Sequence, residues 1–553
     1  MSSNFLQLFS NNINSNIDDH LQELLLPFDI KTEITSYLSQ SDCLTCMTVC
    51  RTWQKQIPQY AQPVWSQLRL HSSNIVLPYH QHQLWEQCIG RHVKSVVFDS
   101  FQLEDDEERL YTTICKLIDN RCDRIQSIEF IDCNTRNEVL LLELLKKLAS
   151  SSTIKLQFTR HSTDLYLAHL IHTCPNLTHF SYSRSYYNGF RKNRKRRNIT
   201  TAQPYIARPE SPFLPMKIYC KNNNEQQPQF PKLIHFKVES RCSDPTVLLQ
   251  INHILQHSPS LEYFTYELRN DGLFTFCNDL VSIDLKQILL SCPNLRYLRG
   301  NVSDDDFIFS KHTHYKDIES YSTVNVSNKK HQQQQYNGGL RYFLGCETKN
   351  YGPEKMEHYL LHNESTLDFL LFKGSMPAVM EPSRTAMASM SNWTHLLQSI
   401  HAPRLRKLVF YNTILDNNPD SIPIMTSNCP MLEELVLEAY SPNNQRTMAL
   451  DIIRLATNTK QLQRLMLAGI TIHVNYHVYF SLPEDEEQQE ENKGYNNQME
   501  KIFKATWVRL QDIYISNVHL TCPNEMLFYK SLTCLPQLKY LKIPKRLALA
   551  VTQ

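Results

Sequence analysis

The chain has 553 residues, of which 41% are hydrophobic and 20% are charged, and its formal net charge is +2. This balance is typical of a soluble folded protein and disfavours an overall electrostatic attraction to nucleic acid or to anionic membranes. Glycine is scarce, at 11 residues, and its only adjacent pair, Gly338-Gly339, lies in a stretch rich in Gln and Asn. Neither a dinucleotide-binding fingerprint nor a P-loop is present, which weakens the case for a nucleotide-using enzyme.

Residues 1–20 are predicted to be a flexible N-terminal segment. They lack the basic start, the continuous apolar stretch and the small-residue cleavage site of a signal peptide. No later stretch approaches about 18 uninterrupted apolar residues, so no membrane span is expected. The protein should therefore stay in a reducing compartment, cytoplasmic or nuclear, with its 16 cysteines as free thiols in small apolar slots.

Residues 24–65 predict two helices with apolar faces. Pro27 stands where a first helical turn tolerates a missing N–H, and Asp29 places a negative charge near the positive end of the helix. The first apolar face is formed by Ile30, Ile34 and Leu38. Ser41-Asp42 is the predicted N-cap of a second helix, whose apolar face is formed by Leu44, Met47, Val49, Cys50, Trp53 and Ile57.

Residues 21–68 resemble an F-box, whose motif is written loosely L-P-x-E-I, then I-x-x-x-L, then D-L, then V-C-R-x-W and a later W. The matching positions are Leu26-Pro27, Ile30, Ile34, Leu38, Asp42, Leu44, Val49-Cys50-Arg51, Trp53 and Trp65. Asp29 replaces the usual glutamate, and Cys43 follows Asp42 where leucine is common. Neither departure disturbs the apolar face.

The resemblance implies that these helices bind the Skp-type adaptor of a cullin–RING ubiquitin ligase and that the rest of the chain captures a protein substrate. Helix-in-groove recognition concentrates the binding energy in a few buried anchors. The predicted adaptor-binding residues are Leu26, Pro27, Ile30, Ile34, Leu38, Leu44, Val49, Cys50 and Trp53. The alternative is a helical hairpin that only caps the rest of the chain.

From residue 69 to residue 553 a leucine-rich pattern recurs in about a dozen units. The pattern P-x-L-x-x-L-x-L is shared by CPNLTHFSY (174–182), SPSLEYFTY (258–266), CPNLRYLRG (292–300), APRLRKLVF (402–410), CPMLEELVL (429–437) and LPQLKYLKI (535–543). Without the proline it includes FPKLIHFKV (230–238), STLDFLLF (365–372), KQLQRLML (460–467) and WVRLQDIYI (507–515), and VKSVVF (93–98) and IQSIEF (125–130) are divergent copies. Spacings such as 27 residues from Leu405 to Leu432 and 38 from Leu367 to Leu405 lie at or above the long end of leucine-rich repeats.

Each unit pairs a helix with a strand. The later apolar positions alternate with period two, as in a strand with one buried face. Several copies are preceded by a segment with helical apolar spacing, namely DLYLAHLIHTC, LLQINHILQHS, DLKQILLSC and ALDIIRLATNT. Cys174, Cys292 and Cys429 are expected in the last turn of such helices. Because one unit cannot bury its apolar face alone, we expect an α/β solenoid with a curved parallel sheet and helices on the outer face. The array resembles leucine-rich repeats of the ribonuclease-inhibitor type.

Three spacings are too long for one unit and contain polar low-complexity sequence, near 184–228, 301–340 and 482–500. Such segments bury too little apolar area to offset their ordering entropy, so they are predicted to be disordered loops, and the first two leave room for a divergent repeat. The first loop contains the basic cluster Arg191, Lys192, Arg194, Lys195, Arg196 and Arg197. This cluster fits a nuclear-import signal or a patch for an acidic partner, and a solvated insertion without a role is equally consistent. Nucleic-acid binding is not favoured, because no aromatic-interleaved basic groove accompanies the cluster.

The residues between the leucines of each unit are expected to face outward on the concave side of the sheet. Tyr and Arg are favoured residue types in protein interfaces. The predicted substrate-binding residues are Tyr263, Tyr297, Arg299, Arg464, Tyr514 and Tyr540. The alternative is that most of these positions are simply solvated or packed surface.

No catalytic residue, metal site or cofactor is predicted. The acidic runs EDDEE (104–108) and EDEEQQEE (484–491) are expected to be solvated, whereas catalytic carboxylates need a fixed, partly buried setting. Cys43-x-x-Cys46 has no second C-x-x-C or histidine cluster to complete a zinc set. The resemblance to an F-box followed by leucine-rich repeats implies a non-catalytic substrate-recognition subunit of an SCF-type ubiquitin ligase. The alternative is a non-degradative scaffold, including a nuclear one.

Overall fold

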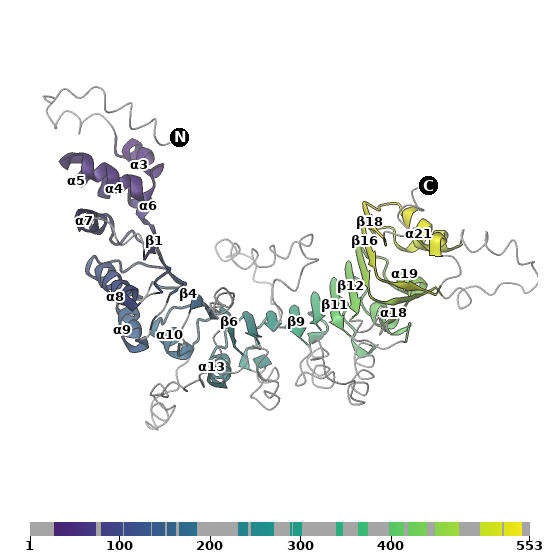
Figure 1. Ribbon diagram of the computed structural model, residues 1–553. Helices are drawn as coiled ribbons and strands as arrows, with labels where there is room; N and C mark the ends of the chain where they lie inside the picture. The colour runs from purple at the N-terminus through teal and green to yellow at the C-terminus, as the bar shows by residue number, and fades with distance from the viewer. Residues whose placement is uncertain are drawn as a thin grey trace, which may run out of the picture. The chain divides into compact units, whose positions relative to one another are not determined.

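In the computed structural model the chain divides into two compact units, residues 1–233 and 234–553, and each unit is described by itself (Figure 1). The structure describes residues 27–72, 79–149, 152–184, 230–269, 288–300, 339–346, 363–373, 398–439, 448–474 and 498–544, with gaps of at most four residues inside several of these ranges.

The described part of the first unit begins with four short helices, α3 (Phe28–Ser36), α4 (Gln40–Val49), α5 (Arg51–Tyr60) and α6 (Gln62–Trp65). Pro27 is the N-cap residue of α3. Asp29 lies in the first turn of this helix, where its negative charge interacts favourably with the positive end of the helix dipole. Figure 1 shows these helices grouped before the first strand. They form the all-α start that the sequence predicts.

The predicted second helix is in fact two helices. Cys50 has an extended backbone, with φ of −156° and ψ of 163°, so α4 ends at Val49 and α5 begins at Arg51. The N-cap of α4 is Ser39, and the predicted Ser41-Asp42 cap is wrong. The Ser39 hydroxyl accepts a hydrogen bond from the Asp42 N–H at 3.1 Å, and the Asp42 carboxylate accepts one from the Ser39 N–H at 3.1 Å. This reciprocal pair is a capping box, which requires Asp42 at the third helical position.

A parallel sheet follows in the first unit, with strand order β1-β2-β3-β4-β5. Its strands are β1 (Gln67–His71), β2 (Ser95–Asp99), β3 (Ser127–Ile131), β4 (Lys155–His161) and β5 (His179–Arg184). The connecting helices are α7 (Tyr79–Cys88), α8 (Glu104–Asp119), α9 (Glu138–Leu148) and α10 (Leu167–Thr173). Figure 1 shows these helices along one side of the strands.

The core of the first unit lies between this sheet and its helices. Phe98, Phe130 and Phe158 occupy the same register position on adjacent strands and are fully buried. Their rings stack with centroid separations of 5.0 Å and 4.8 Å. Because alternate strand residues point to opposite faces, the residues between them line the other face of the sheet. We call this second face, opposite the helices, the front face.

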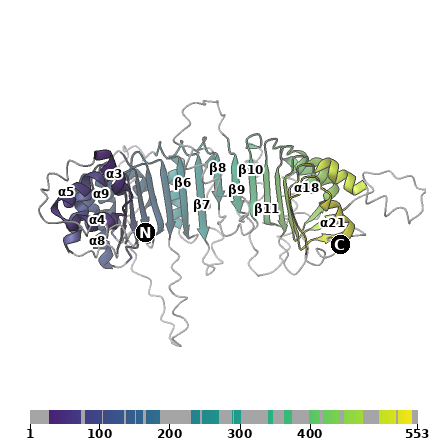
Figure 2. The same cartoon turned by 90° about the horizontal axis from the view of Figure 1, so that it is seen from above.

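The second unit continues the same architecture, with strand order β6-β7-β8-β9-β10-β11-β12-β14-β16-β18, and Figure 2 shows β6 to β11 side by side. The strands are β6 (His235–Arg241), β7 (Tyr263–Arg269), β8 (Tyr297–Gly300), β9 (Tyr342–Cys346), β10 (Phe369–Lys373), β11 (Lys407–Thr413), β12 (Glu434–Ala439), β14 (Arg464–Ala468), β16 (Asp512–Ser516) and β18 (Tyr540–Lys542). The longer helices in the described part of this unit are α13 (Pro245–Gln256), α18 (Ser421–Ser427), α19 (Ile452–Asn458), α21 (Glu525–Thr533) and residues 498–506. Stacked strand–helix units of this kind are consistent with a solenoid-like arrangement.

A small second sheet was not predicted. It consists of β13 (Ala449–Asp451), β15 (Thr471–His473) and β17 (His519–Leu520), all parallel. The helix predicted over ALDIIRLATNT therefore begins only at Ile452, where the Asp451 carboxylate accepts hydrogen bonds from two N–H groups at 3.0 Å. Gly469 leads from β14 towards β15 with a φ of +67°, and an added Cβ would lie 2.7 Å from the Ala439 carbonyl oxygen.

Every predicted repeat segment contains a strand of these parallel sheets, so the strand prediction is confirmed. Sequence reasoning missed β1, β4 and β9. Strand β4 has the buried alternation of Leu156 and Phe158 but no leading proline and leucine. Strand β9 lies in the second long spacing, where the sequence leaves room for a divergent repeat.

The three cysteines that precede a proline are buried, as expected. Cys174 is the C-cap residue of α10, and Cys429 lies one residue beyond the C-cap of α18. The Cys292 thiol lies 3.3 Å from the Leu255 carbonyl oxygen on α13, the helix of the preceding repeat. A small thiol at the helix end thus links neighbouring repeats.

Several predictions lie outside the described residues. These are the N-terminal segment 1–20, Leu26, the basic cluster at 191–197 and most of the insertions predicted near 184–228, 301–340 and 482–500. The exceptions are Arg184 in β5, residues 339–340 before β9 and residues 498–500, which are helical. In the described part of the chain, no helix combines the length and apolarity needed to cross a bilayer.

Candidate functional site

One face of α3 is held against the end of α5. The Thr35 hydroxyl, which is buried, donates a hydrogen bond to the Tyr60 carbonyl oxygen at 2.9 Å. The Lys31 ammonium lies 3.5 Å from the Tyr60 hydroxyl and 5.1 Å from the centroid of its ring. The Phe28 ring lies 5.1 Å from the same ring. These contacts fix the rotation of α3 about its axis.

The other face of α3 carries exposed apolar side chains. Ile30 and Ile34 lie one helical turn apart and are 42% and 45% exposed. Tyr37, just beyond the end of the helix, and Val49, at the end of α4, are exposed as well. Single exposed apolar residues are common, but a row at helical spacing is what a groove-binding helix presents to its partner.

The remaining predicted adaptor-binding residues differ in exposure. Pro27 and Cys50 are exposed, whereas Leu38 and Trp53 are partly buried. Leu44 is buried with the core residues of α4. The apolar face that the structure exposes therefore consists mainly of residues on α3.

Helix α4 packs against helix α7 of the first strand–helix repeat through sulfur-containing side chains. The Cys88 thiol of α7 lies 3.3 Å from the Met47 sulfur of α4. Burial raises the pKa of Cys43 to about 12, and that of Cys88 to about 12. These thiols therefore stay protonated and pack as small apolar side chains. In addition, the Gln40 amide donates to the Gln67 carbonyl oxygen at 2.6 Å, which ties α4 to β1.

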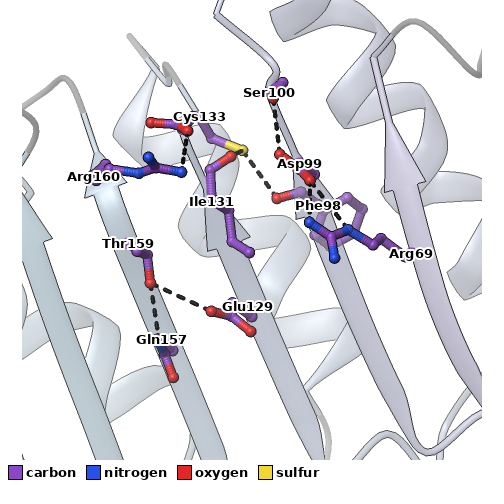
Figure 3. A network of polar contacts seen from close by, with 11 residues as sticks. Arg69, Phe98, Asp99, Ser100, Glu129, Ile131, Cys133, Gln157, Thr159 and Arg160 are labelled. Atoms are coloured by element: carbon purple, nitrogen blue, oxygen red, sulfur yellow. Dashed lines mark hydrogen bonds and ion pairs between the residues drawn. The ribbon is translucent and has the colours of Figure 1, made fainter.

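The front face of the first unit is polar, as Figure 3 shows. The Arg69 guanidinium lies 2.6 Å from the Asp99 carboxylate, and the Ser100 hydroxyl donates to the same carboxylate at 2.8 Å. Burial acts to raise the pKa of Asp99, but the hydrogen bonds from Arg69 and Ser100 and the charge of Arg69 outweigh it and lower the pKa. The carboxylate is thus already satisfied within the chain.

Other polar side chains of this front face are paired within the chain as well. The Arg160 guanidinium lies 2.5 Å from the Asp132 carboxylate. The Gln157 amide donates to the Thr159 hydroxyl at 3.0 Å, and Thr159 lies 3.4 Å from the Glu129 carboxylate (Figure 3). Polar groups of adjacent strands therefore pair with one another across the front face of the first unit.

The front face of the second unit starts with an aromatic row in register on β6 to β10, namely His235, Tyr263, Tyr297, Tyr342 and Phe369. The ring centroids along the first three steps are 6.1, 6.0 and 6.1 Å apart. Tyr297 is only 7% exposed and Arg299 only 5% exposed, so these two predicted substrate-binding residues are closed off from solvent. Tyr263 is partly exposed.

From β11 to β16 the aromatic row gives way to a charged row, Lys407, Glu434, Arg464 and Asp512. The Glu434 carboxylate lies 2.9 Å from the Lys407 ammonium and 4.0 Å from the Arg464 guanidinium. Arg464 also lies 3.1 Å from the Asp512 carboxylate. The predicted substrate-binding residue Arg464 is therefore already engaged in ion pairs.

Beside the charged row runs an apolar row of partly exposed side chains in register, Val409, Val436, Met466 and Tyr514. The Lys542 ammonium lies 4.6 Å from the centroid of the Tyr514 ring, and Tyr540 is exposed on β18. This apolar row lies between the charged row and a third row that contains Tyr411, Glu438 and Ala468.

Comparison with known proteins agrees with the N-terminal geometry. Residues 24–69 match a family model described as F-box-like, and the chain therefore carries an F-box-like domain at its N-terminal helices. F-box domains typically bind Skp-type adaptors, which suggests an adaptor-binding role in SCF-type complexes. No curated protein matches the chain.

Sequence reasoning missed several residues of these surfaces. Tyr37 follows Ile30 and Ile34 at the next helical interval, and this spacing could have identified it. Thr35 and Tyr60 are far apart in sequence and meet only in the tertiary structure. Glu438 directly follows the motif CPMLEELVL, two positions after Val436, so extending the period-two alternation by one step would have placed it on the front face.

Proposed function

We propose that this protein is the substrate-recognition subunit of an SCF-type ubiquitin ligase, binding a Skp-type adaptor through its F-box-like domain. The observation that supports this most is the exposed Ile30 and Ile34 row on α3, inside the region that matches the F-box-like family. An adaptor groove would cover this row and remove its apolar area from water, which is the main source of affinity in helix-in-groove recognition.

The substrate side of the proposal is a leucine-rich-repeat array formed by residues 69–553. The front faces of its parallel strands offer a broad surface with rows of side chains in register. The chain itself performs no bond chemistry in this proposal. It raises the effective concentration of substrate lysines near a ubiquitin-charged enzyme held elsewhere in the assembly, so catalysis comes from proximity.

The proposed location is the cytoplasm, the nucleus or both. The basic cluster at 191–197 supports nuclear import as one half of this proposal. Replacing its six cations with alanine should shift a fluorescently tagged chain towards the cytoplasm. An unchanged distribution would remove the cluster from the proposal.

The adaptor interface is tested by Ile34→Asp in the full chain. A carboxylate on the exposed row must be desolvated in the groove, so co-purification with the adaptor should fall at least about tenfold. The matched control is Val139→Asp on α9, which changes another exposed apolar helix residue outside the F-box-like domain. Undiminished adaptor binding by Ile34→Asp would refute the interface.

The same purification tests the ligase role. Recovery of a cullin together with the adaptor, lost in Ile34→Asp and kept in Val139→Asp, is the expected result. Recovery of the adaptor without a cullin would instead support a non-degradative scaffold.

A further inference from the structure

Glu438 is an acid on the front face of the second unit that the fold leaves uncompensated. It lies near the end of β12, and in the part of the chain that the structure describes its Oε2 atom is buried without a hydrogen-bond partner. Burial raises the pKa of Glu438 to about 7. Glu434, four residues earlier on the same strand, is paired with both Lys407 and Arg464. The two acids thus differ in what their neighbours supply.

Strand register explains the difference. Opposite Glu434 stand Lys407 on β11 and Arg464 on β14, both cations. Opposite Glu438 stand Tyr411 on β11 and Ala468 on β14. Neither of these positions brings a positive charge next to the Glu438 carboxylate. A buried polar group without its partner costs free energy, and a partner from another molecule can recover it.

The surface next to Glu438 is suited to apolar side chains. Val409, Val436 and Met466 of the apolar row are partly exposed and contiguous across β11, β12 and β14. Val436 and Glu438 lie two positions apart on one strand, a distance of roughly 7 Å, so a single short segment can contact both. An unpaired carboxylate repels phosphate groups, which disfavours nucleic acid and anionic lipid as occupants of this surface.

We propose that the front face of β11, β12 and β14 binds a short peptide segment of a partner protein that combines apolar side chains with a lysine or arginine. The apolar side chains cover Val409, Val436 and Met466, and the cation pairs with Glu438. This proposal rests on the proposed receptor function in one respect only, namely that the segment belongs to the captured substrate.

The test is selection of a phage-displayed library of random peptides on the immobilised full chain. Selected peptides should contain a basic residue close to aliphatic or aromatic residues. Their affinity should fall about tenfold or more in Glu438→Gln, because the charge-assisted pair is lost while the side-chain shape is kept. Met466→Gln should weaken the same peptides by removing apolar contact.

The matched control is Glu267→Gln, which changes the acid at the equivalent front-face position of β7, where Thr265 stands in place of Val436. It should leave peptide affinity unchanged. Recovery of no binder, of binders without basic residues, or of binders equally tight to Glu438→Gln would overturn the proposal. Ile34→Asp should lose the adaptor and keep the peptides, and Glu438→Gln should do the reverse, so the two proposals can fail separately.

Discussion

The cores of the two units are built in the same way, whereas their front faces differ. In both, phenylalanines stack from strand to strand behind the sheet, as Phe98 and Phe130 do at 5.0 Å and Phe236 and Phe264 do at 5.4 Å. In front, the first unit pairs its polar groups internally, as Arg69 does with Asp99. The second unit presents aromatic, apolar and charged rows and the acid Glu438, whose buried Oε2 atom has no hydrogen-bond partner among the described residues.

This difference indicates that the buried face of the sheet determines folding, whereas the front face determines recognition. The shared alternation of leucines and phenylalanines builds the strand–helix units in both halves, because buried area drives their stacking. A front face whose polar groups are already satisfied gains little from a partner, whereas a partly exposed apolar row beside an uncompensated carboxylate gains much. The second unit is therefore the better candidate for substrate capture.

The largest expected effect comes from the shared core. Phe130→Ala in the first unit and Phe264→Ala in the second remove fully buried rings, and each should lower the free energy of unfolding by about 3–5 kcal/mol. Hydrogen exchange of β2 to β4 and of β6 to β8 would measure the two losses separately. Glu129→Gln on the front face of β3 is the control and should cost less than about 0.5 kcal/mol. A loss for Glu129→Gln as large as that for Phe130→Ala would contradict the shared-core account.

The next effect is a pH dependence of opposite sign in the two units. The pKa of Glu438 is raised from 4.5 to about 7 in the folded state, so the unfolded state releases its proton first and stability falls as the pH rises through this window. The expected size is about 1–3 kcal/mol after allowance for partial solvent screening. Glu438→Gln should abolish this slope in denaturant titrations at several pH values.

Asp99 provides the opposite case. Its folded-state pKa is lowered, so its contribution is present at neutral pH and is lost as the pH falls below its ordinary value of 3.8. Asp99→Asn should flatten the acid side of the stability profile, and Glu438→Gln should leave that side unchanged. The same slope in both variants would show that the two carboxylates are not distinguished by their surroundings.

The smallest effect concerns the charged row. Lys407→Gln should cost about 1–2 kcal/mol, because the poorly exposed Glu434 carboxylate loses its nearest cation. Arg464→Gln should cost under about 1 kcal/mol, because Lys407 remains 2.9 Å from Glu434. Urea denaturation of both variants measures the difference, and a reversed order would mean that Arg464 is the dominant partner.

The sequence alone predicts most of the strands, and the elements it misses are missed for physical reasons. Period-two alternation and repeated leucines are local signals, so most strands of the long sheet could be read directly, namely β2, β3, β5 to β8, β10 to β12, β14, β16 and β18. Strand β4 lacked the leading leucine and was missed. The continuous helix across Cys50 was wrong because apolar spacing cannot reveal a single extended residue between two helices.

The substrate-binding residues show the same limit more sharply. Tyr297, Arg299 and Arg464 were selected because their residue types are frequent in interfaces. The structure buries the first two and places Arg464 in ion pairs. Residue type does not specify which side chains stand opposite each other, and that depends on strand register.

By itself, the amino-acid sequence determined the repeating strand–helix units and the apolar row of Ile30 and Ile34, because both depend on the spacing of residues within one segment. Tertiary structure alone decided which polar groups find partners. Lys407 and Arg464 reach Glu434 across neighbouring strands, while Glu438 faces Tyr411 and Ala468. Pairing between strands brings together residues about thirty positions apart in the sequence. The electrostatic energy of a charged side chain depends on the residue opposite it on the next strand rather than on its neighbours in the sequence.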